Sequence, residues 1–222
     1  MALSDIDAVA LLVAAGRGER LGSDGPKAFV GVGGRPMVEW SIEALRAVPQ
    51  ITEVVIALPP GITAPHGTVG VTGGAERSHS VRAALHAAPP CDVVVVHDAA
   101  RPLVSPQLIR DCLDELGEHD CDAAIAAAPV ADTIKEAHGG EVTRTLDRRD
   151  LWAVQTPQVF HRDALVRALD AGDDVLAAAT DDASLIEAFG GTVRVVPSAA
   201  PNLKVTTRED LHLADALLRA RR

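Results

Sequence analysis

The sequence predicts an α/β protein with a single Rossmann-like, doubly wound and mostly parallel sheet and a projecting β-hairpin arm. Short apolar runs rich in β-branched residues alternate with amphipathic segments of helical length. The runs are apolar at nearly every position, which is typical of strands that helices cover on both faces. The chain has 222 residues, enough for one large domain, so we expect residues 1–222 to form one domain.

Apolar runs in the first part of the chain predict strands. They lie at 8–13, 53–58, 93–96 and 123–127. The segments between them have the spacing of amphipathic helices, and they lie at 36–47, 78–88 and 106–117. Pro36 and Pro106 suit the first turn of a helix, and Ser105 suits the N-cap of the last one. This alternation of strands and helices favours an open, doubly wound sheet.

The pattern changes at residues 132–151, which are too polar to bury themselves. Gly139 and Gly140 are suited to turn a hairpin between TIKEA and EVTRTL. We therefore expect these residues to form an arm that projects from the body and serves dimerisation.

The last part of the chain returns to regular elements. The predicted helices lie at 162–171, 181–189 and 208–220, and the predicted strand at 192–196. Thr207, followed three residues later by Asp210, resembles a capping box at the start of the final helix.

Composition excludes several classes of protein. The formal net charge of −10 argues against broad nucleic-acid binding, which requires a basic face. No apolar run approaches the roughly 20 residues of a membrane-spanning helix, and the first residues lack the basic region of a signal peptide. The cysteines form no CxxC pair and the histidines show no HExxH spacing, so the sequence assigns no metal ligands. We expect a cytoplasmic protein that binds neither nucleic acid nor a membrane.

Residues 11–27, LLVAAGRGERLGSDGPK, run from the first predicted strand into a turn rich in glycine and positive charge. The turn is not a P-loop, because Lys27 stands between Pro26 and Ala28. It is not a dinucleotide fingerprint, because Leu21 occupies the position of the third glycine. Its backbone N–H groups and cations can hold a polyphosphate, although an ordinary solvated loop has the same composition. The residues concerned are Gly16, Arg17, Gly18, Arg20, Gly22 and Lys27.

Further segments place polar residues next to predicted strands and helices. VTGGAERSHSV puts Gly73 and Gly74 after a strand and Ser80 at a helix start. HDAARP follows an apolar run, so Asp98 and Arg101 emerge at the C-terminal end of a strand, the edge where open α/β sheets bind ligands. Asp98 could instead serve only as a helix N-cap or as the partner of Arg101. The segments TLDRRDLW and NLKVT add the cations Arg148 and Lys204.

Together these segments resemble one family, the 2-C-methyl-D-erythritol 4-phosphate cytidylyltransferases of the non-mevalonate isoprenoid pathway. The matching stretches run from about residue 9 to residue 213 and are AAGRGERLGSDGPK, GGAERSHSV, HDAARP, APVADTIK, LDRRDLWAVQTPQ, TDDASLIE and NLKVTTREDL. The first marks only the wider sugar-nucleotide pyrophosphorylase-like class, with the nucleotide-diphospho-sugar transferase type of fold. HDAARP combined with TPQ and NLKVT is more specific. The resemblance implies transfer of CMP from CTP to methylerythritol phosphate, with Mg²⁺, in a homodimer whose arm reaches the partner's active site.

The resemblance also implies roles for individual residues. Arg20 and Lys27 would stabilise charge at the α-phosphate of CTP. Arg148 and Lys204 would position the attacking phosphate. The nucleotide site would be formed by Ala14, Ala15, Gly16, Gly18, Lys27, Gly74, Ser80 and Asp98. The acceptor site would be formed by Asp98, Arg101, Thr133, Arg148, Thr180 and Lys204.

The implied chemistry needs no protein base. A phosphate monoester, with its second pKa near ~6, is mostly a dianion at neutral pH and can attack phosphorus itself. The protein must instead supply positive charge that stabilises a crowded phosphoryl transition state. We therefore expect His97 to be a packing or hydrogen-bonding residue rather than a base.

Three alternatives remain at this point. A cytidylyltransferase for another polyol phosphate, such as ribitol 5-phosphate, would share the nucleotide loops and differ in the acceptor pocket. A dinucleotide-dependent oxidoreductase is disfavoured because VVIALPPG offers no acidic residue to hold a ribose. A non-catalytic nucleotide-binding module would need no cations at a reacting centre. The sequence departs from the family pattern at three positions, which are Ala28 for a frequent glutamine, Arg17 where the residue is often not basic, and Arg208 for a frequent proline. None of these departures removes a charged residue assigned to the chemistry.

Overall fold

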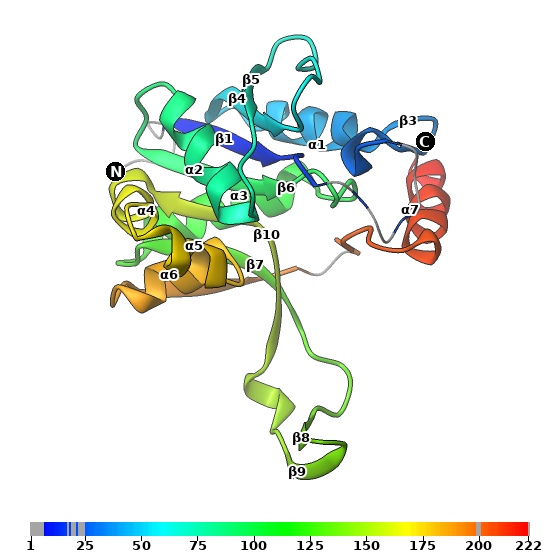
Figure 1. Cartoon of the computed structure of the whole chain (residues 1–222), viewed down its shortest axis with the longest axis vertical. Helices are drawn as coiled ribbons and strands as arrows, with labels where there is room; N and C mark the ends of the chain where they lie inside the picture. The colour runs from blue at the N-terminus through cyan, green and yellow to red at the C-terminus, as the bar shows by residue number, and fades with distance from the viewer. Residues whose placement is uncertain (1–6, 17, 19–20, 22–24, 199–200, 222) are drawn as a thin grey trace.

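The computed structural model describes residues 7–16, 18, 21, 25–198 and 201–221, and its centre is a seven-stranded sheet (Figure 1). From one edge to the other, the strands are β11 (Val193–Pro197), β7 (Ala123–Pro129), β10 (Trp152–His161), β6 (Val93–Asp98), β1 (Ala8–Val13), β4 (Ile51–Leu58) and β5 (Val69–Thr72). Among these strands only β10 runs against its neighbours β6 and β7, and the other pairs are parallel. The predicted mostly parallel sheet is confirmed.

Helices cover both faces of the sheet (Figure 1). On one face pack α1 (Met37–Arg46) and α3 (Pro106–Glu118). On the other face pack α2 (Arg77–Ala87), α4 (Arg162–Leu169), α5 (Asp173–Ala178) and α6 (Asp182–Ala188). Within β1, Leu12 points into the first core and Leu11 into the second. Both faces of the strand are therefore buried, which is why its sequence is apolar without alternation.

The final helix, α7 (Arg208–Ala220), closes a third and smaller core at one end of the sheet. Its capping box is confirmed: the Thr207 hydroxyl accepts a hydrogen bond from the Asp210 N–H at 3.2 Å, and the Asp210 carboxylate accepts one from the Thr207 N–H at 2.8 Å. Asp215 on α7 accepts a hydrogen bond from the Gly33 N–H, in the turn between β2 (Gly31–Val32) and β3 (Arg35–Pro36). These contacts hold α7 beside the segment that follows the glycine-rich turn.

The predicted strands and helices have bounds within two residues of those in the structure. The first strand and the final helix agree with the prediction at both ends. Ser105 caps α3, because its hydroxyl accepts a hydrogen bond from the Leu108 N–H at 3.1 Å. Pro36 differs slightly, since it stands at the N-cap of α1 rather than inside the first turn. None of the helices in the described part of the chain is long and apolar enough to cross a membrane.

The prediction lacked β10, which lies in the middle of the sheet. Its first residues are exposed, and Pro157 argues against a central strand because it has no N–H for a ladder hydrogen bond. The structure accommodates Pro157 in an irregularity, where the register with β7 shifts between Val154 and Gln158. Short β2 and β3, together with α5, were also not predicted.

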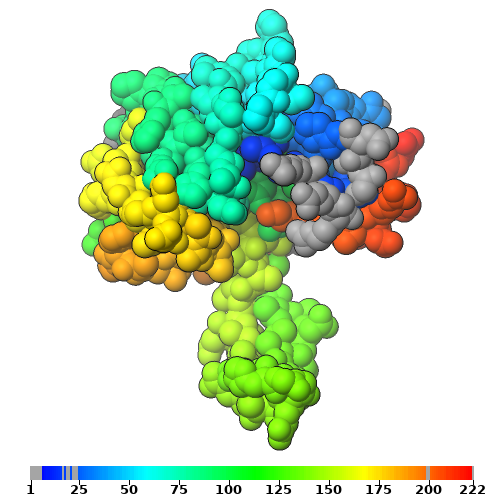
Figure 2. All heavy atoms as spheres, in the orientation of Figure 1, coloured from blue at the N-terminus to red at the C-terminus, as the bar shows by residue number. Residues whose placement is uncertain are grey.

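The polar segment forms an arm that leaves the body between β7 and β10 (Figures 1 and 2). Its tip is an antiparallel hairpin of β8 (Lys135–His138) and β9 (Glu141–Thr145). Gly139 and Gly140 form the turn with φ of +58° and +88°, values that favour glycine at both positions of a type I′ turn. The hairpin is confirmed, and the use of the arm in dimerisation stays a prediction.

Candidate active site

The candidate site lies at the C-terminal ends of β1 and β6, which are neighbouring parallel strands. From β1 the chain continues through α1 to β4 on one side of this pair. From β6 it continues through α3 to β7 on the other side. The two connections diverge here, and a crevice at such a divergence is where open α/β sheets bind ligands.

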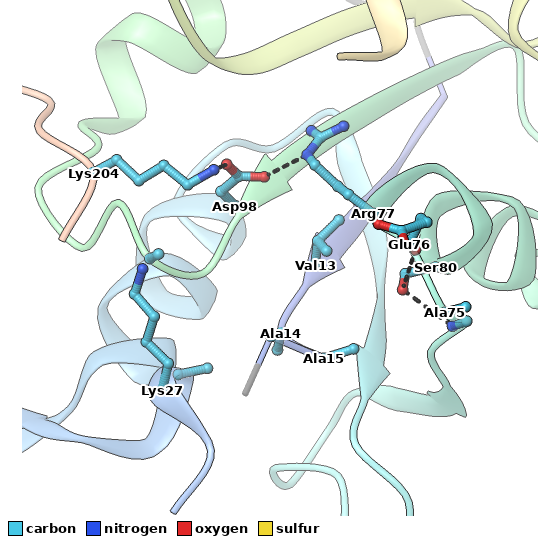
Figure 3. Close-up of a pocket in the computed structure, with 14 residues that line it drawn as sticks. Val13, Ala14, Ala15, Lys27, Ala75, Glu76, Arg77, Ser80, Asp98 and Lys204 are labelled. Atoms are coloured by element: carbon cyan, nitrogen blue, oxygen red, sulfur yellow. Dashed lines mark hydrogen bonds and ion pairs between the residues drawn. The ribbon is translucent and has the colours of Figure 1, made fainter. Parts of the chain in front are cut away.

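A first pocket occupies this crevice, with about 710 Å³ of space that opens to solvent (Figure 3). The backbone after β1 forms one wall, and the turn before α2 forms another. Side chains of Lys27 and Lys204 extend toward the pocket from segments that are far apart in the sequence. The predicted residues brought together here are Ala14, Ala15, Gly16, Lys27, Gly74, Ser80, Asp98 and Lys204. Gly18 lines an adjoining cavity with Gly16 and Lys27.

Two glycines allow the walls of the first pocket to approach each other. A Cβ at Gly73 would lie 2.4 Å from the Cβ of Ala15, and a Cβ at Gly74 would lie 2.3 Å from that of His79. The Gly74 N–H donates to the Ser80 hydroxyl at 3.1 Å, which fixes the turn before α2. A side chain at either glycine would therefore displace the turn that shapes the pocket.

The glycine-rich turn after β1 folds against Lys27. Gly18 has a φ of +73°, and a Cβ there would lie 2.7 Å from the Cβ of Lys27. Lys27 begins a short 3₁₀ helix, Lys27–Phe29, directly after Pro26. Arg20, predicted to stabilise charge, lies outside the described residues, as do Arg17 and Gly22.

A charge cluster separates the first pocket from a second one. The Asp98 carboxylate accepts from Arg77 Nε at 3.0 Å through Oδ1 and from Lys204 Nζ at 2.6 Å through Oδ2 (Figure 3). Burial alone would raise the pKa of Asp98, but the two cations outweigh it and hold that pKa well below its usual range. Asp98 is therefore a carboxylate over the whole physiological pH range.

Arg77 is the residue that the sequence analysis missed. It opens α2, lines both pockets, and also contacts Asp182 of α6 through Nη1 at 2.5 Å. The available signal was an arginine three residues after the paired glycines in GGAERSHSV. Its partner Asp182 lies in the segment TDDASLIE, but nothing in either segment indicates that the two side chains meet.

The second pocket has about 790 Å³ of space, open to solvent, and lies beside the first. Arg77, Asp98 and Lys204 line both pockets, so the charge cluster is their common wall. The predicted residues Arg101 and Thr180 line the second pocket, together with polar side chains of β10. This arrangement can hold two ligands side by side with anionic groups against the same cations.

Arg101 and the neighbouring His97 are tied into the protein. Arg101 donates to the carbonyl of Asn202 at 2.7 Å, which anchors the segment that carries Lys204. His97 is fully buried between the Thr156 hydroxyl, at 3.0 Å from Nδ1, and the Arg101 carbonyl, at 3.3 Å from Nε2. Burial lowers the pKa of His97 to about 4, so the ring is neutral at pH 7.

Two predicted acceptor residues are not in either pocket of this chain. Thr133 and Arg148 are exposed on the arm, and Arg148 donates a hydrogen bond to the carbonyl of Ala131, just before the arm begins. Of the predicted acceptor residues, a single chain brings Asp98, Arg101, Thr180 and Lys204 together at the second pocket.

No cluster of three or more histidine, cysteine or acidic side chains suited to a metal ion occurs among the residues that the structure describes. Asp98 is the carboxylate common to both pockets, and both of its oxygens are already ion-paired. The side chains that the structure describes at the pockets therefore do not provide enough free oxygen ligands for a metal ion held by the protein alone.

Comparison with known proteins identifies the family. The family model for IspD, 2-C-methyl-D-erythritol 4-phosphate cytidylyltransferase, matches residues 8–220. The chain belongs to this family.

Individual members agree with that assignment. Two relatives named 2-C-methyl-D-erythritol 4-phosphate cytidylyltransferase are each 46% identical to this chain. The Frankia casuarinae protein aligns over 94% of this chain and 80% of its own length, and the Deinococcus radiodurans protein over 94% and 88%. The crystal structure of the cytidylyltransferase from Thermus thermophilus superposes with a TM-score of 0.80 at 38% identity, covering 95% of this chain and 98% of that one. The resemblance inferred from the motifs is confirmed, and this member of the cytidylyltransferase family is a nucleotidyltransferase.

Proposed function

We propose that this family member transfers CMP from CTP to 2-C-methyl-D-erythritol 4-phosphate, giving 4-diphosphocytidyl-2-C-methyl-D-erythritol and pyrophosphate. The observation that carries the proposal is the common wall of the two pockets, Arg77, Asp98 and Lys204. A transfer between two anionic substrates requires adjoining sites with positive charge between them. The names of the relatives supply the substrate pair, as part of isoprenoid synthesis.

The first pocket would take CTP. Ala14, Ala15, Gly74 and Ser80 line it with small side chains and backbone groups that suit a planar base. Gly16 and Lys27 line the same pocket, and Gly18 lines the adjoining cavity, so that N–H groups and an ammonium are available for the triphosphate. Arg20 is assigned to the same phosphates.

The second pocket would take the acceptor, with Thr180, Arg101 and Asp98 toward its polyol and Lys204 toward its phosphate. The acceptor phosphate is mostly a dianion at neutral pH and attacks the α-phosphorus of CTP in line with the departing pyrophosphate. One P–O bond forms and one breaks, so no proton has to move. A base is unnecessary, which agrees with the neutral and buried state of His97.

A homodimer would complete the acceptor pocket. Thr133 and Arg148 stand on an arm that extends from the body of its own chain, where a second subunit can reach them. We assign the arm, residues 132–151, to dimerisation, and Arg148 to the acceptor phosphate of the partner's site.

Mg²⁺ would accompany the triphosphate. It commonly keeps several waters and binds through substrate phosphates with few protein ligands, so a cage of side chains is not required. The cytoplasm is the assigned compartment because the reaction consumes CTP.

The test is pyrophosphate release from CTP and Mg²⁺ with 2-C-methyl-D-erythritol 4-phosphate, with ribitol 5-phosphate, or without an acceptor. Turnover that depends on methylerythritol phosphate is the expected result. Release with ribitol 5-phosphate alone would contradict the substrate, and no release with either acceptor would contradict the reaction.

A further inference from the structure

We propose that Arg77 and Asp182 form a positioning pair for this transfer: Asp182 anchors the Arg77 guanidinium, which holds Asp98 so that Asp98 places Lys204 between the two pockets. The inference rests on the proposed function. Neither Arg77 nor Asp182 is assigned a contact with the reacting phosphates, so both act through other residues.

The four side chains form a chain of alternating charge. Arg77 Nη1 lies 2.5 Å from Asp182 Oδ2, and Arg77 Nε lies 3.0 Å from Asp98 Oδ1. Lys204 Nζ lies 2.6 Å from Asp98 Oδ2. Because guanidinium and carboxylate groups are planar and directional, fixing one end restricts the next member in turn.

The two carboxylates of this chain are buried, and the two ends differ most in exposure. The side chain of Asp182 is 0% exposed and that of Asp98 is 8% exposed. Arg77 is 25% exposed and Lys204 is 41% exposed. The buried end is therefore fixed by the protein, whereas the ammonium at the other end can meet a ligand.

The pair also joins the walls of the two pockets. Arg77 is the first residue of α2, whose preceding turn lines the first pocket. Asp182 is the first residue of α6, and its neighbours Asp181 and Ser184 line the second pocket. A shift of either helix would reach Asp98 through the guanidinium.

A purely structural ion pair is the competing explanation. Removing one partner of a buried pair leaves the other charge uncompensated, which destabilises a protein whatever the pair does. Neutralising both partners leaves neither of them as an unpaired charge, and Asp98 keeps its ion pair with Lys204, so the loss of stability should be small. The double variant Arg77→Gln, Asp182→Asn therefore separates the two explanations.

The experiment measures thermal unfolding, kcat and the pH dependence of kcat/KM for the wild type, the double variant and Arg77→Lys. The matched control neutralises another ion pair of α2, Arg82 with Asp173, whose nitrogen and oxygen lie 2.7 Å apart outside both pockets. That control, Arg82→Gln with Asp173→Asn, is expected to keep wild-type kcat and pH dependence.

We expect the double variant to unfold near the wild-type temperature but to lose at least about tenfold in kcat, as for a displaced charge near the reacting centre. The acid limb of its pH profile should move toward neutral pH, because burial raises the pKa of Asp98 and only Lys204 then remains to lower that pKa. The titratable and charged groups around Asp98 are Arg77, Lys204, His97, Arg101 and Asp182. Arg77→Lys retains the charge, so it should restore the acid limb and recover only part of kcat.

A double variant with kcat within about twofold of the wild type and an unchanged acid limb would overturn the positioning role, because a displaced charge costs far more than that. If the double variant fails to fold, Arg77→Lys provides the test instead. A wild-type kcat in Arg77→Lys would then overturn the positioning role. Absence of turnover by the wild type with CTP and methylerythritol phosphate would remove the proposed function itself. The two failures are therefore distinguishable.

Discussion

His97 and Asp98 are consecutive residues at the end of β6, and burial has opposite outcomes for their charge. Asp98 stays ionised because Arg77 and Lys204 together compensate for lost hydration. His97 is neutral because burial disfavours its protonated form more than the nearby Asp98 favours it. The single residues of the site thus have defined charge states before any ligand binds, as electrostatic catalysis requires.

The buried, neutral state of His97 predicts a pH dependence of stability. Its pKa is about 4 in the folded chain and 6.5 as the reference value, so between these values the unfolded chain binds a proton that the folded chain does not. Stability from this residue is present above pH 6.5 and is lost as the pH falls toward 4, by up to about 3 kcal/mol. Urea unfolding at pH 7 and pH 4 should show a smaller loss for His97→Gln than for the wild type. Equal losses in both proteins would contradict the assignment.

At the scale of elements, the arm forms from local sequence, whereas its proposed role depends on a second subunit. Its hairpin follows from the paired glycines and from sequence polarity, and no residue of β9 is buried. Val142 in β9 is 55% exposed, and Val154 in β10, just after the arm, is 43% exposed. Contact with a second subunit would cover them.

Mixing two inactive variants tests whether the arm is shared. Lys27→Ala should lower kcat by roughly 10²–10³, the usual loss for a preorganised charge, and Arg148→Ala should impair use of the acceptor. If Arg148 serves the partner's site, a one-to-one mixture should recover about a quarter of wild-type activity, because half of the dimers have one intact site. Subunit exchange is verified by mass spectrometry.

The matched control is Arg149→Ala, next to Arg148 and ion-paired with Asp147 within the arm. It should keep near-wild-type kcat on its own. No recovery in the mixture despite verified exchange would show that each chain uses its own arm.

At the scale of the whole molecule, the first pocket gathers positively charged side chains although the chain as a whole is negatively charged. The chain has a formal net charge of −10, yet Lys27, Arg77 and Lys204 line the first pocket. The two large cores on the faces of the sheet hold the strand ends in place without any metal cluster among the described residues. Folding and metal use are therefore expected to be independent.

Removal of divalent metal should abolish activity without affecting the stability of the fold. Addition of EDTA is expected to stop pyrophosphate release, and excess Mg²⁺ to restore it, if the metal accompanies CTP as proposed. The thermal unfolding temperature without CTP should be the same with and without EDTA, as measured by calorimetry. A lower unfolding temperature in EDTA would reveal a structural metal site.

Local sequence was sufficient to predict the elements whose causes are local. The apolar run of β1, the capping box of α7 and the glycine turn of the arm each lie within a few residues of the chain. The glycine-rich turn and the motif HDAARP also indicated which edge of the sheet binds ligands, because parallel strands share their C-terminal edge.

Features that depend on residues far apart in the sequence could be recognised only in the tertiary structure. β10 enters the middle of the sheet although Pro157 argues against it, because β6 and β7 pair with it on either side. Arg77 and Asp182 are 105 positions apart, and nothing in either local sequence indicates that they meet. An ion pair depends on separation in space, whereas the periodicity of a sequence reports only which face of an element is buried.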